Sequence, residues 1–264
     1  MRDILLTMAQ MNCLAGRPES NLREMERFVR DYGSSDIICF PEMCLSGYST
    51  SDPELYALTP DDPLVKKVHE LASETGAAIV FGYIERAPDG LYLRQEIADG
   101  SDAPKFYRKT HLGFAESKVF LASDSIPVFD VKGVCIGIQL CVESHIPDIC
   151  QTLRAKGAEL VLTPFSTGIS GTKRRSVWLS YLPARASDNG MFVAACSATG
   201  DNGLGTVFGG GMIVLDPKGQ VIDEYYGTDA GALTLEIGGK LPRDGPESMS
   251  NISYFDRRRP ELYK

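Results

Sequence analysis

Apolar and polar positions along this chain follow two spacings, one typical of strands and the other of helices. Short, largely apolar runs predict strands at residues 4–11, 37–40, 78–84, 134–140, 160–163 and 191–197. Between them, apolar residues recur every three or four positions, which predicts amphipathic helices at residues 21–32, 64–75, 147–156 and about 173–188. This alternation of strands and helices indicates the α/β class.

Turn-forming clusters predict two antiparallel strand pairs. Ala98-Asp-Gly-Ser101 lies inside the strand-like segment 91–107, and Asp216-Pro-Lys-Gly219 separates residues 212–215 from 221–225. Segments 36–41 and 159–164 share an acidic residue, an apolar run and a proline, a weak echo that suggests two α/β halves. No linker or abrupt change of composition divides the chain, so we predict a single domain over residues 1–264.

The composition is that of a folded chain with a sizeable core. Of its 264 residues, 43% are hydrophobic and 23% are charged. The net charge of −8 argues against nucleic acid or an anionic membrane as a partner, because those ligands bind clustered Lys and Arg. The N-terminus shows no signal-peptide pattern, and no apolar stretch is long enough to span a bilayer. We therefore expect a cytoplasmic protein.

The seven cysteines do not form a recognisable framework. Their number is odd and no C-x-x-C pair occurs, so we predict reduced thiols with neither a disulfide framework nor a zinc site. Cys39, Cys135 and Cys196 lie in apolar runs, where a cysteine is usually a small core residue. We expect no bound metal and no cofactor.

Three chemically active residues follow strand-like runs. Glu42 follows residues 37–41, Lys109 follows 105–108, and Cys141 follows 134–140. Cys141 lies on a strand-to-helix turn, where backbone N–H groups would face the thiol, and we expect this geometry to lower the thiol pKa. If the fold brings the three together, they supply a base, a cation for an oxyanion and a nucleophile.

At these residues the chain resembles the nitrilase, or carbon-nitrogen hydrolase, superfamily. The matching motifs are Phe40-Pro41-Glu42, Tyr107-Arg108-Lys109-Thr110-His111-Leu112, Cys141-Val142-Glu143 with Pro147-Asp148, and the segments 185–190 and 208–217. Their order and separations fit the family over nearly the whole chain. The resemblance implies a four-layer αββα sandwich, which in the family usually forms homodimers or higher homo-oligomers. The chain departs from the family at Val142, where many members carry an aromatic residue.

The resemblance also implies roles for individual residues. Glu42 would be the general base and Cys141 the nucleophile, while Lys109 and the Val142 N–H would hold the oxyanion. Glu116 matches a second glutamate that lies beside the lysine. A general-base role for a nearby histidine is disfavoured, because His145 would have to point back toward the thiol, and Glu143 is explained by the preference for acids in a first helical turn. Candidate pocket residues are Tyr48, Phe114 and Phe165.

The resulting hypothesis is a hydrolase that cleaves the carbon–nitrogen bond of a small carboxamide through a cysteine thioester and releases ammonia. Hydrolysis of an N-carbamoyl amine or amino acid, or of a nitrile, would use the same three residues. A glutaminase that passes ammonia to a partner synthetase and a catalytically silent dimeric scaffold are further alternatives. A cationic side chain about one substrate length from Cys141 would indicate a substrate with a carboxylate, and the candidates are Lys173, Arg174 and Arg175.

Overall fold

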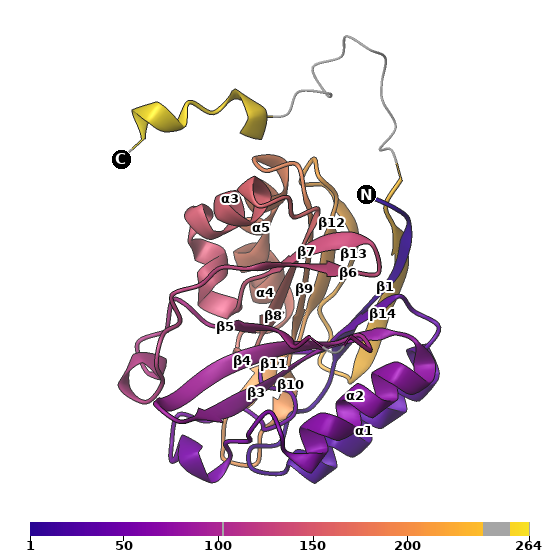
Figure 1. Ribbon diagram of the computed structural model, residues 1–264, viewed down its shortest axis with the longest axis vertical. Coiled ribbons are helices and arrows are strands. Elements are labelled where there is room, and N and C mark those ends of the chain that lie inside the picture. The colour runs from indigo at the N-terminus through magenta and orange to yellow at the C-terminus, as the bar shows by residue number, and fades with distance from the viewer. Residues whose placement is uncertain (102, 240–253, 264) are drawn as a thin grey trace.

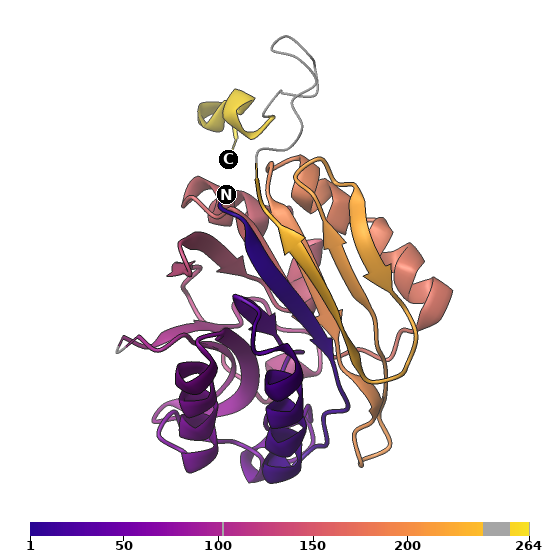
Figure 2. The same ribbon diagram turned by 90° about the vertical axis from the view of Figure 1, so that its right-hand side faces the viewer.

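The computed structural model describes residues 1–101, 103–239 and 254–263. Two six-stranded sheets pack face to face, and helices cover the outer face of each (Figures 1 and 2). This is the four-layer αββα sandwich that the resemblance implied, so the expected fold class is confirmed. All seven cysteines are free thiols in this structure.

The first sheet has the strand order β14-β1-β2-β3-β4-β5. These strands are β1 (Ile4–Gln10), β2 (Ile37–Cys39), β3 (Ala78–Ala87), β4 (Gly90–Ala98), β5 (Lys105–Arg108) and β14 (Gly231–Ile237). Strands β1, β2 and β3 are parallel, whereas β14, β4 and β5 join through antiparallel pairings. Helices α1 (Pro18–Tyr32) and α2 (Pro63–Thr75) cover the outer face of this sheet (Figure 2).

The second sheet has the order β13-β12-β9-β8-β7-β6. Its strands are β6 (Val128–Val131), β7 (Val134–Ile138), β8 (Leu160–Phe165), β9 (Phe192–Ser197), β12 (Met212–Leu215) and β13 (Val221–Tyr225). Strands β7, β8 and β9 are parallel. Helices α3 (Pro147–Ala155), α4 (Gly171–Leu179) and α5 (Leu182–Ser187) cover the outer face, and β10 (Thr199–Asp201) pairs separately with β11 (Val207–Gly209).

Alternating residues of both sheets fill the core between them. Leu6 and Met8 of β1 and Ile136 and Ile138 of β7 belong to one fully buried cluster. The intervening residues point outward, and Phe81 of β3, for example, packs with helices α1 and α2. One domain over residues 1–264 stays a prediction, and this shared core supports it.

The carboxyl ends of the strands position the residues of interest. In the first sheet, β5 runs in the same direction as β3, because two successive antiparallel pairings connect them. Strands β2 and β5 therefore end at the same edge of that sheet. In the second sheet the parallel strands β7 and β8 end together. The segments that follow these four ends form the candidate site.

Several predicted elements differ from the observed ones. The predicted helix at about 173–188 is interrupted between α4 and α5, because Pro183 lies in the first turn of α5 and its ring cannot fit inside a continuous helix. The predicted strand pair around residues 98–101 is present as β4 and β5, but β4 also forms a tighter hairpin with β3 that closes between Ala87 and Gly90. Strands β6 and β14 were not predicted.

Candidate active site

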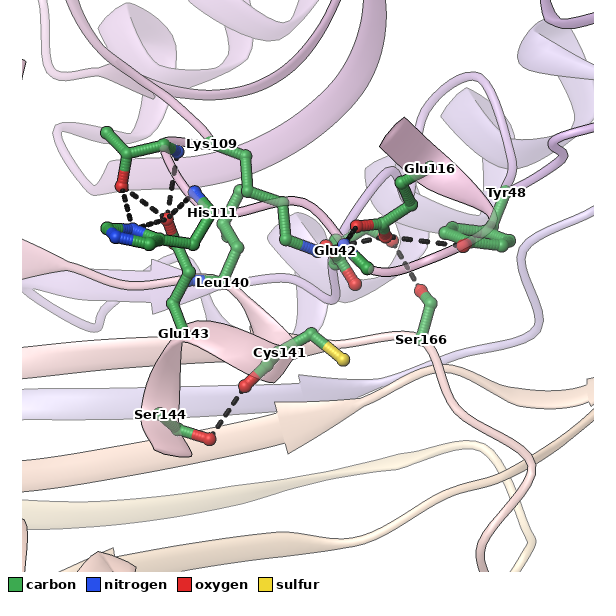
Figure 3. Close-up of polar contacts among 12 residues, drawn as sticks. Glu42, Tyr48, Lys109, His111, Glu116, Leu140, Cys141, Glu143, Ser144 and Ser166 are labelled. Carbon is green, nitrogen blue, oxygen red and sulfur yellow. Dashed lines mark hydrogen bonds and ion pairs between the residues drawn. The ribbon is translucent and has the colours of Figure 1, made fainter. Parts of the chain in front are cut away.

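Three strand ends place Glu42, Lys109 and Cys141 in one region (Figure 3). Glu42 follows β2, Lys109 follows β5, and Cys141 follows β7 after Gln139 and Leu140. Glu42 and Lys109 are each 1% exposed, although they carry opposite charges. Buried charges are stable only when they are paired, so the arrangement of their partners is decisive.

The ammonium of Lys109 lies between two carboxylates. Its Nζ atom donates to Oε1 of Glu42 at 2.8 Å and to Oε1 of Glu116 at 2.9 Å. Glu116 is itself 5% exposed, and its Oε2 accepts from the Gly113 N–H at 2.6 Å. The hydroxyl of Tyr48 donates to Oε1 of Glu116 at 3.2 Å. Glu116 therefore holds the lysine ammonium together with Glu42 (Figure 3).

These contacts shift the pKa values of the paired groups. Burial raises the pKa of Glu42 to about 7, although the charge of Lys109 opposes this shift and that of Glu116 adds to it. Burial alone would lower the pKa of Lys109, but the negative charges of Glu42 and Glu116 raise it well above its usual value. Lys109 therefore stays cationic, whereas the Glu42 carboxyl can gain or lose a proton near neutral pH.

Each partner keeps an unused hydrogen-bonding position. Oε2 of Glu42 is buried and has no hydrogen-bond partner among the described residues. An ammonium carries three hydrogens, and Lys109 uses two of them on Glu42 and Glu116. A buried carboxylate oxygen without a donor is unfavourable in isolation. The site thus has a free acceptor and a free donor available for another molecule.

Cys141 has an unusual backbone conformation for a residue with a side chain. Its φ angle is +47°, in the left-handed region that favours glycine, and it begins the short 3₁₀ turn Cys141–His145. Figure 3 shows its sulfur pointing away from this turn, on the side where Glu42 and Ser166 lie. The strained turn therefore presents the thiol to the site.

The expectation of a lowered thiol pKa is wrong for this state of the protein. Burial raises the pKa of Cys141 to about 12, the charge of Glu42 raises it further, and the charge of Lys109 lowers it only in part. No long helix begins at the cysteine either, because α3 starts at Pro147. The thiol is therefore protonated at neutral pH and needs a base to become a nucleophile.

The backbone N–H of Val142 donates no hydrogen bond to any residue that the structure describes. Val142 is partly exposed and follows the thiol directly. A donor in this position is available to an oxygen atom on a carbon bound to the sulfur.

Glu143 connects the segments that carry Lys109 and Cys141, and sequence reasoning missed this. Its side chain is fully buried, and Oε2 accepts from the Leu140 N–H at 2.7 Å, one residue before the thiol. Oε1 accepts four hydrogen bonds, from the Tyr107 hydroxyl, the Thr110 N–H, the Thr110 hydroxyl and the His111 N–H. The C-x-E spacing was visible in the sequence, but nothing in it indicated burial.

The three candidate pocket residues have different surroundings. Tyr48 is half-buried and contacts Glu116, as described, and it also lines a pocket of about 340 Å³. Phe165 is 3% exposed and packs 5.1 Å from Trp178, in the cluster against which Cys141 packs. Phe114 is 83% exposed, and its nearest cation is Lys118 at 4.3 Å from the ring centre. The ring of Phe114 faces solvent in this chain, and its place in a pocket wall stays a prediction.

The three cationic candidates also differ in burial. Lys173 and Arg175 are exposed, and Arg175 forms an ion pair with Glu224 at 2.8 Å. Arg174 is 1% exposed, and its charge lowers the pKa of Cys141.

The ring of His145 stacks 4.1 Å from that of Tyr181, which agrees with the expectation that it is not the base.

The described residues contain no cluster of His, Cys, Asp and Glu able to hold a metal ion. In the same part of the chain, no helix is both long enough and apolar enough to cross a bilayer.

Comparison with known proteins is consistent across sequence and structure. A family model described as carbon-nitrogen hydrolase matches residues 5–238. A hydrolase of Pseudomonas protegens is 31% identical over 92% of this chain and 85% of the relative, and a 2-oxoglutaramate amidase of Bacillus subtilis is 28% identical over 98% of both. Among solved structures, a mutant amidase of Nesterenkonia sp. AN1 in complex with butyramide has a TM-score of 0.80 at 26% identity, covering 98% of this chain and 95% of that one.

Proposed function

Because the chain belongs to the carbon-nitrogen hydrolase family, we propose that it hydrolyses a small carboxamide through a thioester on Cys141 and releases ammonia. Its relatives and structural neighbours are amidases and nitrilases, so the chain is an enzyme and the silent-scaffold alternative is set aside. The names of two of them, a 2-oxoglutaramate amidase and an amidase in complex with butyramide, refer to amides and support this choice over a nitrile.

The observation that carries the proposal is the unpartnered Oε2 of Glu42 in a carboxyl group whose pKa is about 7. A base must be ionised to accept a proton and must hold that proton well enough to return it. A carboxyl group with an ordinary pKa would be a poor acid at neutral pH. Its second oxygen, Oε1, is occupied by Lys109, so Oε2 is the atom free to exchange protons.

In the first half of the reaction, Glu42 takes the proton of the Cys141 thiol as the sulfur attacks the amide carbon. The carbonyl oxygen becomes an oxyanion, which the free hydrogen of Lys109 and the Val142 N–H stabilise. Glu42 then gives the proton to the amide nitrogen, the carbon–nitrogen bond breaks, and ammonia leaves. The acyl group remains on sulfur as a thioester.

In the second half, water replaces ammonia at the same carbon. Glu42 takes a proton from the water, the hydroxyl adds to the thioester carbon, and the same two donors stabilise the second oxyanion. The carbon–sulfur bond then breaks and the proton returns to Cys141. The sum is amide plus water giving a carboxylic acid and ammonia, and the chain's own residues supply every proton transfer.

Ammonia release from a panel of small amides, N-carbamoyl compounds and nitriles tests the proposal. We expect the purified protein alone to hydrolyse amides fastest. If an N-carbamoyl compound or a nitrile is hydrolysed faster, the proposed carboxamide substrate is wrong and that compound class takes its place. Release from glutamine only after a second protein is added would instead favour the glutaminase alternative.

We also propose that the enzyme works as a homodimer or higher homo-oligomer in the cytoplasm. The chain's membership of the family supports pairing, since family members usually pair. Light scattering of the purified protein measures the mass directly, and a monomer at assay concentration would contradict the proposal.

A further inference from the structure

Lys109 follows a strand at the edge of the first sheet. This strand, β5, has only four residues, and it pairs with β4, while no described strand pairs with its other side. Directly after the strand, the Lys109 N–H donates to the Leu93 carbonyl at 2.9 Å. An edge strand leaves half of its backbone groups without a partner strand, so side-chain contacts must help to fix its end.

The end of β5 is held from both faces of the sheet. Successive side chains of a strand point to opposite faces, so Tyr107 and Lys109 share one face while Arg108 lies on the other. Tyr107 is 1% exposed and belongs to the core between the sheets. Its hydroxyl donates to Oε1 of Glu143 at 2.6 Å. Arg108 therefore points to the outer face, where it has different partners.

On the outer face, Arg108 forms a two-pronged ion pair with Glu85 of β3. Its Nε donates to Oε2 of Glu85 and its Nη2 donates to Oε1, both at 2.7 Å. Glu85 is 2% exposed, and Cζ of Arg108 lies 4.1 Å from the ring centre of Tyr92 on the intervening strand β4. A bidentate pair of this kind fixes orientation as well as distance. The pair thus ties the end of β5 to a strand two positions away in the sheet.

The position of Arg108 depends on the charge of Glu85. Arg94 and Arg108 lie directly opposite each other on β4 and β5, and like charges in such a pair are destabilising. Arg94 contacts Glu85 at 3.2 Å and has a second partner in Glu96, at 2.8 Å. Without the charge of Glu85, Arg108 would lose the only ion pair that it forms with the described residues. Its side chain is already 26% exposed, so it would turn to solvent.

From these contacts we infer that the ion pair of Glu85 and Arg108 positions Lys109 for the reaction. The pair fixes the end of β5, so that the ammonium of Lys109 stays within hydrogen-bond distance of Glu42 and Glu116. The inference rests on the function proposed above, because it concerns the same lysine. Glu85 and Arg108 are positioning residues, which act through the backbone of the residue that follows Arg108.

The test measures how fast a neutral haloacetamide alkylates Cys141 at different pH values, by mass spectrometry of the peptide that contains it. Alkylation needs the ionised Glu42 carboxylate. Burial raises the pKa of that carboxyl to about 7, and the charge of Lys109 opposes this shift. In Glu85→Gln we expect the acid limb of the profile to move to higher pH by about 0.5 unit or more, because the ammonium moves away from Glu42. Loss of the negative charge of Glu85 by itself would move the limb to lower pH.

Amide hydrolysis gives a second readout. In Glu85→Gln, kcat should fall by about tenfold while KM changes little, because alignment rather than substrate contact is lost. Arg108→Lys keeps the positive charge but loses the planar fork, so it should show both effects at a smaller size. Because Arg108 is partly exposed, this variant decides the matter if Glu85→Gln does not fold.

Glu96→Gln is the matched control. Glu96 is 3% exposed, lies on the same face of the sheet and accepts from Arg94, but it forms no hydrogen bond with Arg108. Its substitution should lower the denaturant midpoint of unfolding, as that of Glu85 does, and leave kcat and the acid limb at wild-type values.

The inference is overturned if the limb stays in place or moves to lower pH in Glu85→Gln and Arg108→Lys. An equal upward displacement in Glu96→Gln also overturns it, because the effect would then follow from lost stability alone. If the wild type hydrolyses no amide, the proposed function fails instead, and the alkylation profile still decides the inference.

Discussion

Lys109 Nζ lies 2.8 Å from Oε1 of Glu42, although the two residues are 67 positions apart and both are almost completely buried. The ion pair leaves Oε2 of Glu42 free and keeps Lys109 cationic beside it. A proton acceptor and a stabilising cation thus occur together without neutralising each other, because Glu116 shares the lysine. The predictions below follow from this arrangement.

Glu42→Gln should lower kcat/KM for amides by about 100- to 10,000-fold, because an amide side chain cannot accept the thiol proton. Steady-state kinetics of ammonia release measure this loss. The alkylation of Cys141 by a neutral haloacetamide should slow as well. Glu74→Gln, an exposed position on α2, is the matched control and should behave as the wild type. Wild-type turnover in Glu42→Gln would remove this residue from the mechanism.

The pH dependence of kcat/KM should have an acid limb with an apparent pKa near 7. Glu42 is the group concerned, since burial raises its pKa to about 7 and its ionised form is the one that accepts a proton. Activity is therefore lost as the pH falls, by about tenfold per unit well below 7. Full activity at pH 5 would contradict the assignment of Glu42 as the base.

Glu116→Gln should move that acid limb to lower pH. The negative charge of Glu116 raises the pKa of Glu42, and the substitution removes this charge. The substitution also disturbs the contact with the Gly113 N–H, so kcat should fall at every pH. A pH–rate profile separates the two effects, and a limb displaced upward would show that Glu116 acts on Glu42 in another way.

Glu143→Gln should reduce kcat by about 10- to 100-fold and leave KM nearly unchanged, because it loosens the alignment of Lys109 and Cys141 rather than the substrate contacts. The Glu143 carboxylate accepts five hydrogen bonds, and a glutamine amide has only one oxygen to accept them. The substitution should therefore lower the free energy of unfolding by about 2–4 kcal/mol. Denaturant unfolding and kinetics measure the two quantities.

Tyr107→Phe provides the graded control for this prediction, since it removes one of the five hydrogen bonds and leaves the carboxylate in place. Its effect on kcat should be several-fold smaller than that of Glu143→Gln. If Glu143→Gln lowers stability but not kcat, the residue supports the fold without positioning the site.

The sequence was sufficient to predict the α/β class and the strand ends, because each of Glu42, Lys109 and Cys141 follows a run of strand-like residues. Parallel strands end at the same edge of a sheet. Once the family resemblance supplied the topology, the meeting of these three residues could therefore be predicted. Burial could not be predicted in the same way. The raised pKa of Cys141, the exposure of Phe114 and the central place of Glu143 depend on which segments of other strands pack beside them.

Local chemistry also overrode periodicity in one helix. The apolar pattern of residues 173–188 is continuous, yet Pro183 forces a new helix to begin. The new helix, α5, carries Arg185, whose Nε donates to the Ser144 carbonyl at 3.0 Å, three residues after the nucleophile.

The central claim is that the acyl group of the substrate passes through the sulfur of Cys141. The most direct test is to let the enzyme react with a slowly hydrolysed amide, quench the reaction rapidly, and analyse the peptides of the enzyme by mass spectrometry. The account predicts a transient mass increase equal to the amide minus ammonia, confined to the peptide that contains Cys141 and absent from Cys141→Ala. Turnover without such an adduct, an adduct on another residue, or ammonia release by Cys141→Ala at the wild-type rate would contradict it.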